Sequence, residues 1–145
     1  MRLMAIFLTL FISCFVDAVE VPKNLVGKQI KYILERTSGD FSSYRGHIFE
    51  TSFSDNSNYE DIDLTNGLVN DCGTYHYFKT GDDTAELHYI TQNKGPWKNM
   101  HFVEKLQFTS NTQGCVEGSH VGDIMCGYSG TFTIHDILIT TEGLQ

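Results

Sequence analysis

The sequence predicts an all-β protein built as an antiparallel meander of about eight strands. Short segments in which apolar and polar residues alternate recur along the chain between turn residues, and no long amphipathic helical pattern interrupts them. The chain has only 2 prolines, Pro22 and Pro96, and both fall outside the predicted strands. We expect such a meander to close into a barrel, which removes exposed strand edges, and a β-sandwich is the alternative.

Most of the strands can be bounded from the alternation. They cover residues 28–36, 47–53, 59–64, 73–79, 84–91, 100–109 and 128–140, and a further short strand is expected near Cys115. In the last segment the pattern puts Phe132, Ile134 and Leu138 on one face.

The clearest hairpin joins residues 73–79 to residues 84–91 through a turn that contains Gly81. Glycine tolerates the positive φ that such a turn needs. A loop of residues 81–83 sets three cross-strand pairs: Tyr77 with Leu87, Tyr75 with Tyr89, and His76 with His88. The first two pairs form an aromatic, apolar face, and the histidine pair lies on the opposite face.

The N-terminus has the features of a secretory signal peptide. Arg2 supplies a basic start, residues 3–16 form an apolar stretch, and Val16 and Ala18 are small residues at the −3 and −1 positions of a cleavage site. The stretch is shorter than the ~20 residues of a membrane span, and an uncleaved anchor is the alternative. We therefore expect residues 1–18 to be a signal peptide and residues 19–145 to be a single secreted, extracellular β-barrel domain without a membrane span.

The chain is acidic, with a net charge of −8. Such a surface repels polyanions, so nucleic acid is not an expected partner. Acidic residues concentrate between Asp55 and Asp63, and their oxygens are of the kind that Ca²⁺ prefers. The stretch does not fit an EF-hand loop, and a solvated loop and edge strand is the alternative.

The mature chain contains three cysteines, Cys72, Cys115 and Cys126, because Cys14 falls in the signal peptide. In an oxidising compartment we expect a disulfide between Cys115 and Cys126, the nearest pair in sequence. Cys72 is then buried and free or links a homodimer, and bridges from Cys72 to either other cysteine are the alternatives. A zinc site is not expected, since no C-x-x-C pair is present.

Four short motifs resemble the strand cores of a known superfamily. They are the G-T-Y-x-Y of residues 73–77, the T-A-x-L of 84–87, the L-x-F of 106–108 and the G-T-F of 130–132, which follow an opening Leu25-Val26-Gly27-Lys28. Together they resemble the calycins, lipocalin-like barrels that include the MoaF-type small β-barrels. The G-x-W of lipocalins is absent, since Gly27-Lys28-Gln29 stands in its place. The resemblance implies a binding or structural module and supplies no catalytic residue.

An eight-stranded barrel can be filled by side chains or can hold one small ligand. Alternation directs a set of candidate ligand-binding residues into the interior: Tyr32, Phe49, Tyr75, Tyr77, Leu87, Tyr89, Phe102, Glu104, Phe108 and Phe132. Buried tyrosine hydroxyls need hydrogen-bond partners, which water or a ligand could supply. The alternative is a packed core with the tyrosine hydroxyls at the barrel mouth.

Catalytic and metal motifs are weak in this sequence. His76 and His88 could share a metal ion, but the spacing fixes no third ligand, and a solvated polar face is the alternative. Neither G-x-S-x-G nor H-E-x-x-H occurs. We therefore expect no enzymatic activity, no metal and no cofactor.

The sequence thus predicts a secreted β-barrel that binds a small apolar or amphipathic molecule. An extracellular structural or interaction protein, associated with calcium or linked by a disulfide, is the first alternative. A small barrel enzyme that uses Glu104 or a histidine at the barrel mouth is the second.

Overall fold

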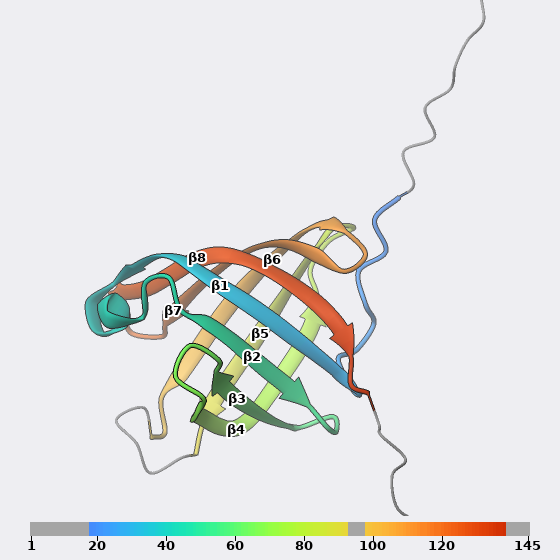
Figure 1. Ribbon diagram of the computed structural model, residues 1–145. Helices are drawn as coiled ribbons and strands as arrows, with labels where there is room; N and C mark the ends of the chain where they lie inside the picture. The colour runs from blue at the N-terminus through green and yellow to red at the C-terminus, as the bar shows by residue number, and fades with distance from the viewer. Residues whose placement is uncertain (1–17, 93–97, 139–145) are drawn as a thin grey trace, which may run out of the picture.

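The strands form a closed antiparallel barrel in which each strand pairs with the next and β8 returns to β1 (Figure 1). A computed structural model describes residues 18–92 and 98–138. The strands are β1 (Lys28–Ser38), β2 (Ile48–Phe53), β3 (Asn58–Asp63), β4 (Leu68–Lys79), β5 (Thr84–Thr91), β6 (His101–Ser110), β7 (Gln113–His120) and β8 (Asp123–Asp136). A short 3-10 helix, η1 (Gly39–Tyr44), lies between β1 and β2. The predicted all-β meander and its closure are confirmed, and the chain does not form the alternative sandwich.

The largest differences from the predicted strand ends are in β4, β7 and β8. β4 begins at Leu68 rather than at Gly73, β8 begins at Asp123 rather than at Tyr128, and β7 is a full strand. β8 ends at Asp136, because its partner β1 begins at Lys28, directly opposite. Leu138, which was predicted on the inner face of the last strand, therefore lies beyond it and is 88 % exposed.

The predicted register of the β4–β5 hairpin is confirmed. The cross-strand pairs are Tyr75 with Tyr89, His76 with His88, and Tyr77 with Leu87. Along β5 and β6 every second side chain is buried, as the alternation requires: Ala85, Leu87, Tyr89, Thr91, Phe102, Glu104, Leu106 and Phe108. The inner face of the barrel is therefore the one that the sequence pattern selects.

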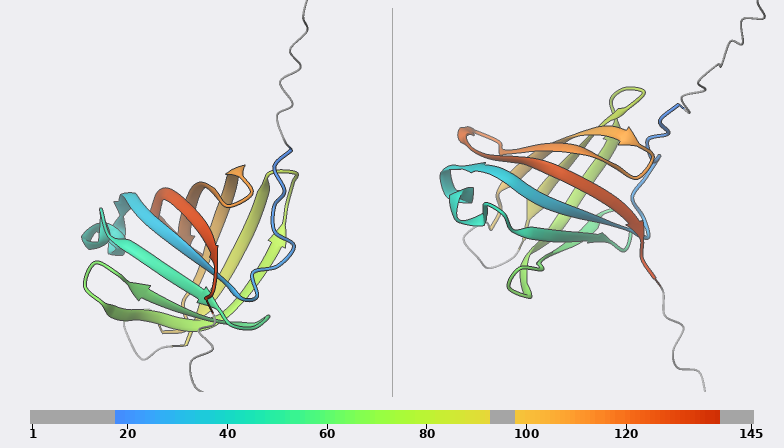
Figure 2. Two further views of the ribbon diagram at one scale, coloured as in Figure 1. Left: turned by 45° about the vertical axis from the view of Figure 1, so that its right-hand side comes forward. Right: turned by 45° about the horizontal axis from the view of Figure 1, so that its top comes forward.

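The N-terminal segment closes one end of the barrel. Figures 1 and 2 show this segment, in blue, at the end where β1 begins and β8 finishes, away from η1. Val21 and Leu25 are buried there in the core. The Tyr77 hydroxyl donates to the Pro22 carbonyl over 2.9 Å, and the backbone N–H of Glu20 donates to Asn111 Oδ1 over 2.7 Å. Residues before β1 are thus part of the folded domain.

The half of the barrel next to this segment is a packed apolar core. The rings of Phe53 and Tyr75 meet at a centroid distance of 4.7 Å, and those of Phe108 and Phe132 at 5.0 Å, both edge to face. The most deeply buried side chains include Leu25, Ile30, Phe53, Leu87, Leu106 and Phe132. This half leaves the opposite end of the barrel, beneath η1, as the place where a cavity can form.

Cys72, Cys115 and Cys126, the cysteines among the described residues, are all free. The predicted Cys115–Cys126 bridge is not formed, because the β7–β8 ladder places Cys115 opposite Thr131, five residues along β8 from Cys126. At ~3.3 Å per residue that separation exceeds the ~7 Å limit between the Cα atoms of a disulfide. Cys72 is half-buried and free, and a homodimer linked through it stays a prediction.

Two further predictions concern the signal peptide and membrane spans. Residues 1–17, which contain nearly all of the predicted signal peptide, lie outside the described residues. Within the described ranges, no helix has the length and apolar character that crossing a membrane requires.

Leu25 should be essential to the stability of the barrel although it precedes the first strand. It is 0 % exposed, whereas its neighbour Val26 is 38 % exposed. We expect Leu25→Ala to lower the free energy of unfolding by about 2–5 kcal/mol, since it leaves a cavity, and Val26→Ala to lower it by less than about 1 kcal/mol. Urea unfolding of the mature chain measures both. Equal effects of the two substitutions would show that the segment does not close the barrel.

Candidate ligand-binding cavity

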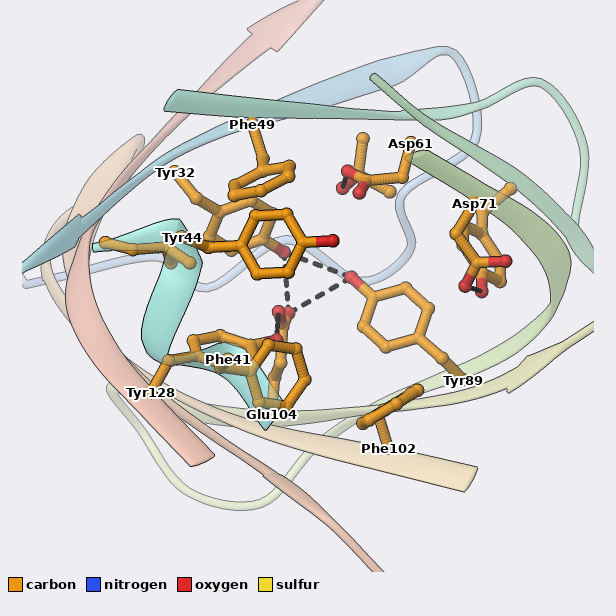
Figure 3. Close-up of a pocket in the computed structure, with 13 residues that line it drawn as sticks. Tyr32, Phe41, Tyr44, Phe49, Asp61, Asp71, Tyr89, Phe102, Glu104 and Tyr128 are labelled. Atoms are coloured by element: carbon orange, nitrogen blue, oxygen red, sulfur yellow. Dashed lines mark hydrogen bonds between the residues drawn. The ribbon is translucent and has the colours of Figure 1, made fainter. Parts of the chain in front are cut away.

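A cavity of about 80 Å³ occupies the end of the barrel beneath η1 (Figure 3). A water molecule needs only about 10–15 Å³ of such space, so the cavity accepts several waters or a small organic molecule. Its lining comes from seven of the strands and from η1: Tyr32, Leu34, Phe41, Tyr44, Phe49, Thr51, Tyr59, Asp61, Asp71, Tyr89, Phe102, Glu104 and Tyr128. The lining combines aromatic rings with carboxylates.

Glu104 is the centre of the polar contacts in the cavity. It points inward from β6 and is only 3 % exposed. The hydroxyls of Tyr32 and Tyr89 donate to its Oε2 over 2.7 and 3.0 Å, and the Tyr128 hydroxyl donates to its Oε1. The Tyr32 and Tyr89 oxygens are also 3.1 Å apart. Tyrosines from β1, β5 and β8 thus converge on one carboxylate (Figure 3).

Gly118 of β7 makes the contact between Tyr128 and Glu104 possible. In the sheet it lies between them, paired with Glu104 on β6 and with Tyr128 on β8. A Cβ atom at this position would stand 2.2 Å from Cζ of the Tyr128 ring, far inside van der Waals contact. The absence of a side chain on β7 therefore lets the tyrosine ring cross that strand and reach the carboxylate.

A second acidic pair lines the cavity from β3 and β4. Asp61 and Asp71 lie directly opposite each other in the ladder. The Tyr59 hydroxyl donates to Asp71 Oδ2 over 2.7 Å, and the Thr51 hydroxyl donates to Asp61 Oδ1 over 2.7 Å. Each carboxylate is thus held by a hydroxyl on a neighbouring position of the barrel wall, as Glu104 is.

Aromatic rings from η1 and the adjacent strands complete the cavity wall. Phe41 packs edge to face against Phe102 and Tyr128, at centroid distances of 5.5 and 4.9 Å. Tyr44 meets Phe49 in the same way at 5.6 Å. Aromatic pairs in this geometry add about 0.5–1.5 kcal/mol beyond the area they bury. The short helix is therefore fixed over the cavity by the rings that it contributes.

Burial controls the charges inside the cavity. It raises the pKa of Tyr32, Tyr89 and Tyr128 well above 10, and the nearby Glu104 charge raises them further, so these groups remain hydroxyl donors at neutral pH. Burial also raises the pKa of Glu104, although the hydrogen bonds from the three tyrosines oppose the shift. The pKa of Asp71 is raised for the same reason, and the Tyr59 hydroxyl opposes it.

The cavity brings together half of the residues predicted to bind a ligand. Five line it: Tyr32, Phe49, Tyr89, Phe102 and Glu104. The other five, Tyr75, Tyr77, Leu87, Phe108 and Phe132, are not among its lining residues. They also face the barrel interior but belong to the half that the N-terminal segment fills, and Tyr77 bonds to that segment through Pro22.

Several lining residues were missed by the sequence prediction. Alternation in the sequence places Tyr128 on the same face as Phe132 and places Tyr59 and Asp61 on one face of β3, so the inward orientation of these three residues could have been predicted. The acidic composition of β3 concealed it, because such a strand resembles a solvated edge. Phe41 and Tyr44 had none, since they lie in the irregular connection that forms η1.

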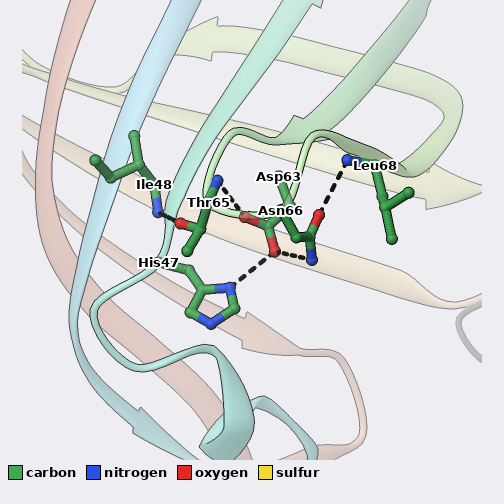
Figure 4. A network of polar contacts seen from close by, with 6 residues as sticks. All are labelled: His47, Ile48, Asp63, Thr65, Asn66 and Leu68. Carbon is green, nitrogen blue, oxygen red and sulfur yellow. Dashed lines mark hydrogen bonds and ion pairs between the residues drawn. The ribbon is translucent and has the colours of Figure 1, made fainter.

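The predicted acidic stretch divides among three environments. Asp55 stabilises its own turn, and its carboxylate accepts the backbone N–H groups of Ser57 and Asn58, both over 2.7 Å. Asp61 faces the cavity. Asp63 accepts hydrogen bonds from His47 Nδ1 over 2.8 Å and from the following turn, as Figure 4 shows. The stretch therefore offers a cation no common shell of ligands.

The predicted histidine pair lies outside the cavity. His88 and His76 are cross-strand neighbours. Nε2 of His88 lies 3.1 Å from Glu86 Oε2, and Nδ1 of His88 lies 3.3 Å from Nε2 of His101. Among the described residues, no group of three or more histidine, cysteine, aspartate or glutamate side chains is arranged to hold a metal ion.

Comparison with known proteins yields no relative. A scan against protein-family models, a search of curated proteins and a search of solved structures each find no match to this chain. The closed eight-stranded antiparallel barrel is compatible with a calycin-like fold, and no match assigns the chain to that family.

Gly118→Ala should disturb the cavity through Tyr128. The added Cβ would collide with the ring, so we expect a loss of about 1–3 kcal/mol in the free energy of unfolding. In a Tyr128→Ala background the same substitution should cost much less, because the ring is gone. Urea unfolding of the two single variants and the double variant measures this coupling. Additive effects would mean that the two residues do not share the space.

Glu104 should make stability depend on pH. Burial raises its pKa in the folded state, so its contribution to stability is fully present below the unfolded pKa of about 4.3 and is lost as the pH rises through the folded value. Glu104→Gln removes this loss. Relative to the wild type, the free energy of unfolding of this variant should therefore increase from about pH 4 to neutrality.

The control for this measurement is Glu117→Gln, which removes the same charge from an exposed position on β7. Its difference from the wild type should change little over the same range. If urea unfolding at a series of pH values gives parallel curves for the two variants, burial of Glu104 does not determine the pH dependence.

Proposed function

We propose that this chain is a secreted, calycin-like binding protein that holds a small, partly apolar molecule in the cavity beneath η1. The observation that carries the proposal is the cavity itself, in which aromatic walls surround a buried carboxylate with a fixed set of donors. Binding sites for small molecules have this character: a mostly apolar concave surface with few, well-oriented polar groups.

The aromatic walls supply a surface for the apolar part of a ligand. Phe41, Phe49 and Phe102 contribute rings to the lining, and Leu34 adds an aliphatic side chain. Burying apolar area is worth about 25 cal/mol per Å², so even a ligand of a few carbon atoms gains affinity by leaving water. The cavity volume limits this ligand to a small size.

The polar groups of the cavity are oriented before any ligand enters. Glu104 is held by hydroxyls from three different strands, which fixes the direction of its carboxylate. A group that is already in place loses little conformational freedom on binding, and this lowers the cost of association. Preorganisation therefore supports a role in recognition.

The same contacts favour binding over catalysis. A general acid or base exchanges a proton with its substrate and needs access to it. Three of the acceptor sites of Glu104 are instead occupied by tyrosines whose hydroxyls stay protonated, so the carboxylate is held as a hydrogen-bond acceptor. The proposal accordingly includes no enzymatic activity, and its extracellular location rests on the signal-like residues 1–18.

A cavity-filling substitution tests the location of the ligand. Leu34 lines the cavity, whereas the preceding Ile33 points outward and is 44 % exposed. We expect Leu34→Phe to abolish or strongly weaken the binding of small molecules, because the larger ring takes up the cavity volume. Ile33→Phe adds the same ring type to the outer face of the same strand and should leave binding unchanged.

Ligand-observed NMR of the mature chain with a panel of neutral and charged molecules no larger than benzylamine measures this effect. Thermal unfolding of both variants confirms that they are folded. The proposal fails if no molecule binds the wild type, or if Leu34→Phe binds as well as Ile33→Phe does.

A further inference from the structure

Among the described residues, no basic side chain forms an ion pair with Glu104. Its three hydrogen-bond donors, Tyr32, Tyr89 and Tyr128, are neutral hydroxyls. Two of these bonds reach Oε2 and one reaches Oε1, while a carboxylate has about four acceptor sites. Glu104 thus retains acceptor capacity at Oε1 for a group that enters the cavity.

Two more carboxylates give the cavity a negative field. Asp71 is held by the Tyr59 hydroxyl and by the backbone N–H of Cys72, which are both neutral. Asp61 lies directly across the ladder from Asp71, and like charges in that position destabilise a sheet. No lysine, arginine or histidine is among the described residues that line the cavity. A cation inside it would therefore be stabilised by every charged group of the lining.

The imidazoles of His47 and His120 contact rings that line the cavity but do not line the cavity themselves. His47 lies 5.6 Å from the Tyr44 ring, between centroids, and is bonded to Asp63. His120 lies 5.4 Å from the Phe102 ring. Neither is a counter-ion for Glu104, whose hydrogen bonds go to the tyrosines.

The aromatic wall suits an organic cation in particular. Cations are attracted to the faces of aromatic rings within about 6 Å, and the attraction grows when water is excluded. Four rings with no charge of their own, those of Phe41, Tyr44, Phe49 and Phe102, line the same small cavity as the carboxylates. Such a wall binds an alkyl or aryl group as well as the charge attached to it.

Other ligand classes fit these features less well. A metal ion needs several converging ligands, and the described residues form no such group of three. An anion is repelled by the carboxylates, and a neutral apolar molecule leaves the Glu104 charge buried without a counter-ion.

We propose that the cavity binds a small organic cation, a protonated amine on a short apolar body, with its ammonium group at the Glu104 carboxylate. This inference rests on the proposed function and adds the chemical class of the ligand. The ammonium donates to Glu104, and Asp61 and Asp71 add to the attraction. The apolar body packs against the rings beneath η1.

Three probes of nearly the same size separate charge from apolar contact: n-butylamine, 1-butanol and butyrate, which are cationic, neutral and anionic at pH 7. Isothermal titration calorimetry with the mature chain gives the affinity for each. We expect the amine to bind about 10–100-fold more tightly than the alcohol, because a hydrogen bond to a charged partner is stronger by that factor. Butyrate should bind most weakly.

Matched variants test the assignment of the ammonium site. Glu104→Gln should lower the affinity for n-butylamine by roughly 10–100-fold and change the affinity for 1-butanol by less than about twofold. Asp71→Asn, which retains an acceptor for Tyr59, is the second variant in case the first does not fold, and it should weaken only the amine. Glu117→Gln removes one charge from the exposed face of β7 and should leave all three affinities unchanged.

The outcomes separate this inference from the proposed function. If 1-butanol binds as tightly as n-butylamine, the cavity is a binding site but the cationic class is wrong. If amine binding survives in both Glu104→Gln and Asp71→Asn, the ammonium site is wrong. If none of the probes binds to the folded wild type, and no other small molecule does, both proposals fail.

Discussion

The buried carboxylate of Glu104 is the constraint on which the cavity end of the barrel depends. An ionised carboxyl group in an apolar interior costs several kcal/mol unless donors surround it. The chain provides these donors from β1, β5 and β8, so the positions of three strands around the barrel are fixed relative to one side chain. Gly118 extends the same arrangement to β7, since only an empty position there admits the Tyr128 ring.

The two halves of the barrel interior differ: one is a packed apolar core, and the other contains a cavity lined by polar and aromatic side chains. One half is filled by aromatic and aliphatic side chains and is closed by the segment that contains Val21 and Leu25, which provides the apolar burial that a small domain needs. The other half can then tolerate polar side chains around a cavity. Tyr77 illustrates the division, because its ring belongs to the packed core while its hydroxyl holds the closing segment through Pro22. The packed core and the cavity are thereby separated along the barrel axis, and under the proposed function so are stability and ligand recognition.

The fold could be predicted from the sequence because alternation is a local signal. The register of the β4–β5 hairpin follows from one turn, and it correctly pairs Tyr75 with Tyr89. The site could be predicted only in part, since alternation tells which residues face inward but not at which height along the barrel they lie. Phe108 and Glu104 share a strand and a face, yet only Glu104 reaches the cavity. The position of η1 depends on the tertiary packing of Phe41 against Phe102 and Tyr128, and no periodicity in the sequence predicts that packing.

The acidic residues of β3 and β4 show why composition alone does not predict which side chains line the cavity. A strand rich in aspartate is normally solvated, and for the outward positions this holds. Asp61 and Asp71 nevertheless face the interior, directly opposite each other, a placement of like charges that in general destabilises a sheet. A protein selected for stability alone would place apolar residues at both positions, as it does on the inner face of β6 at Leu106 and Phe108. If the cavity binds a positively charged group, as we propose, that group supplies the counter-ion that the described lining residues do not provide for Asp61, Asp71 and Glu104.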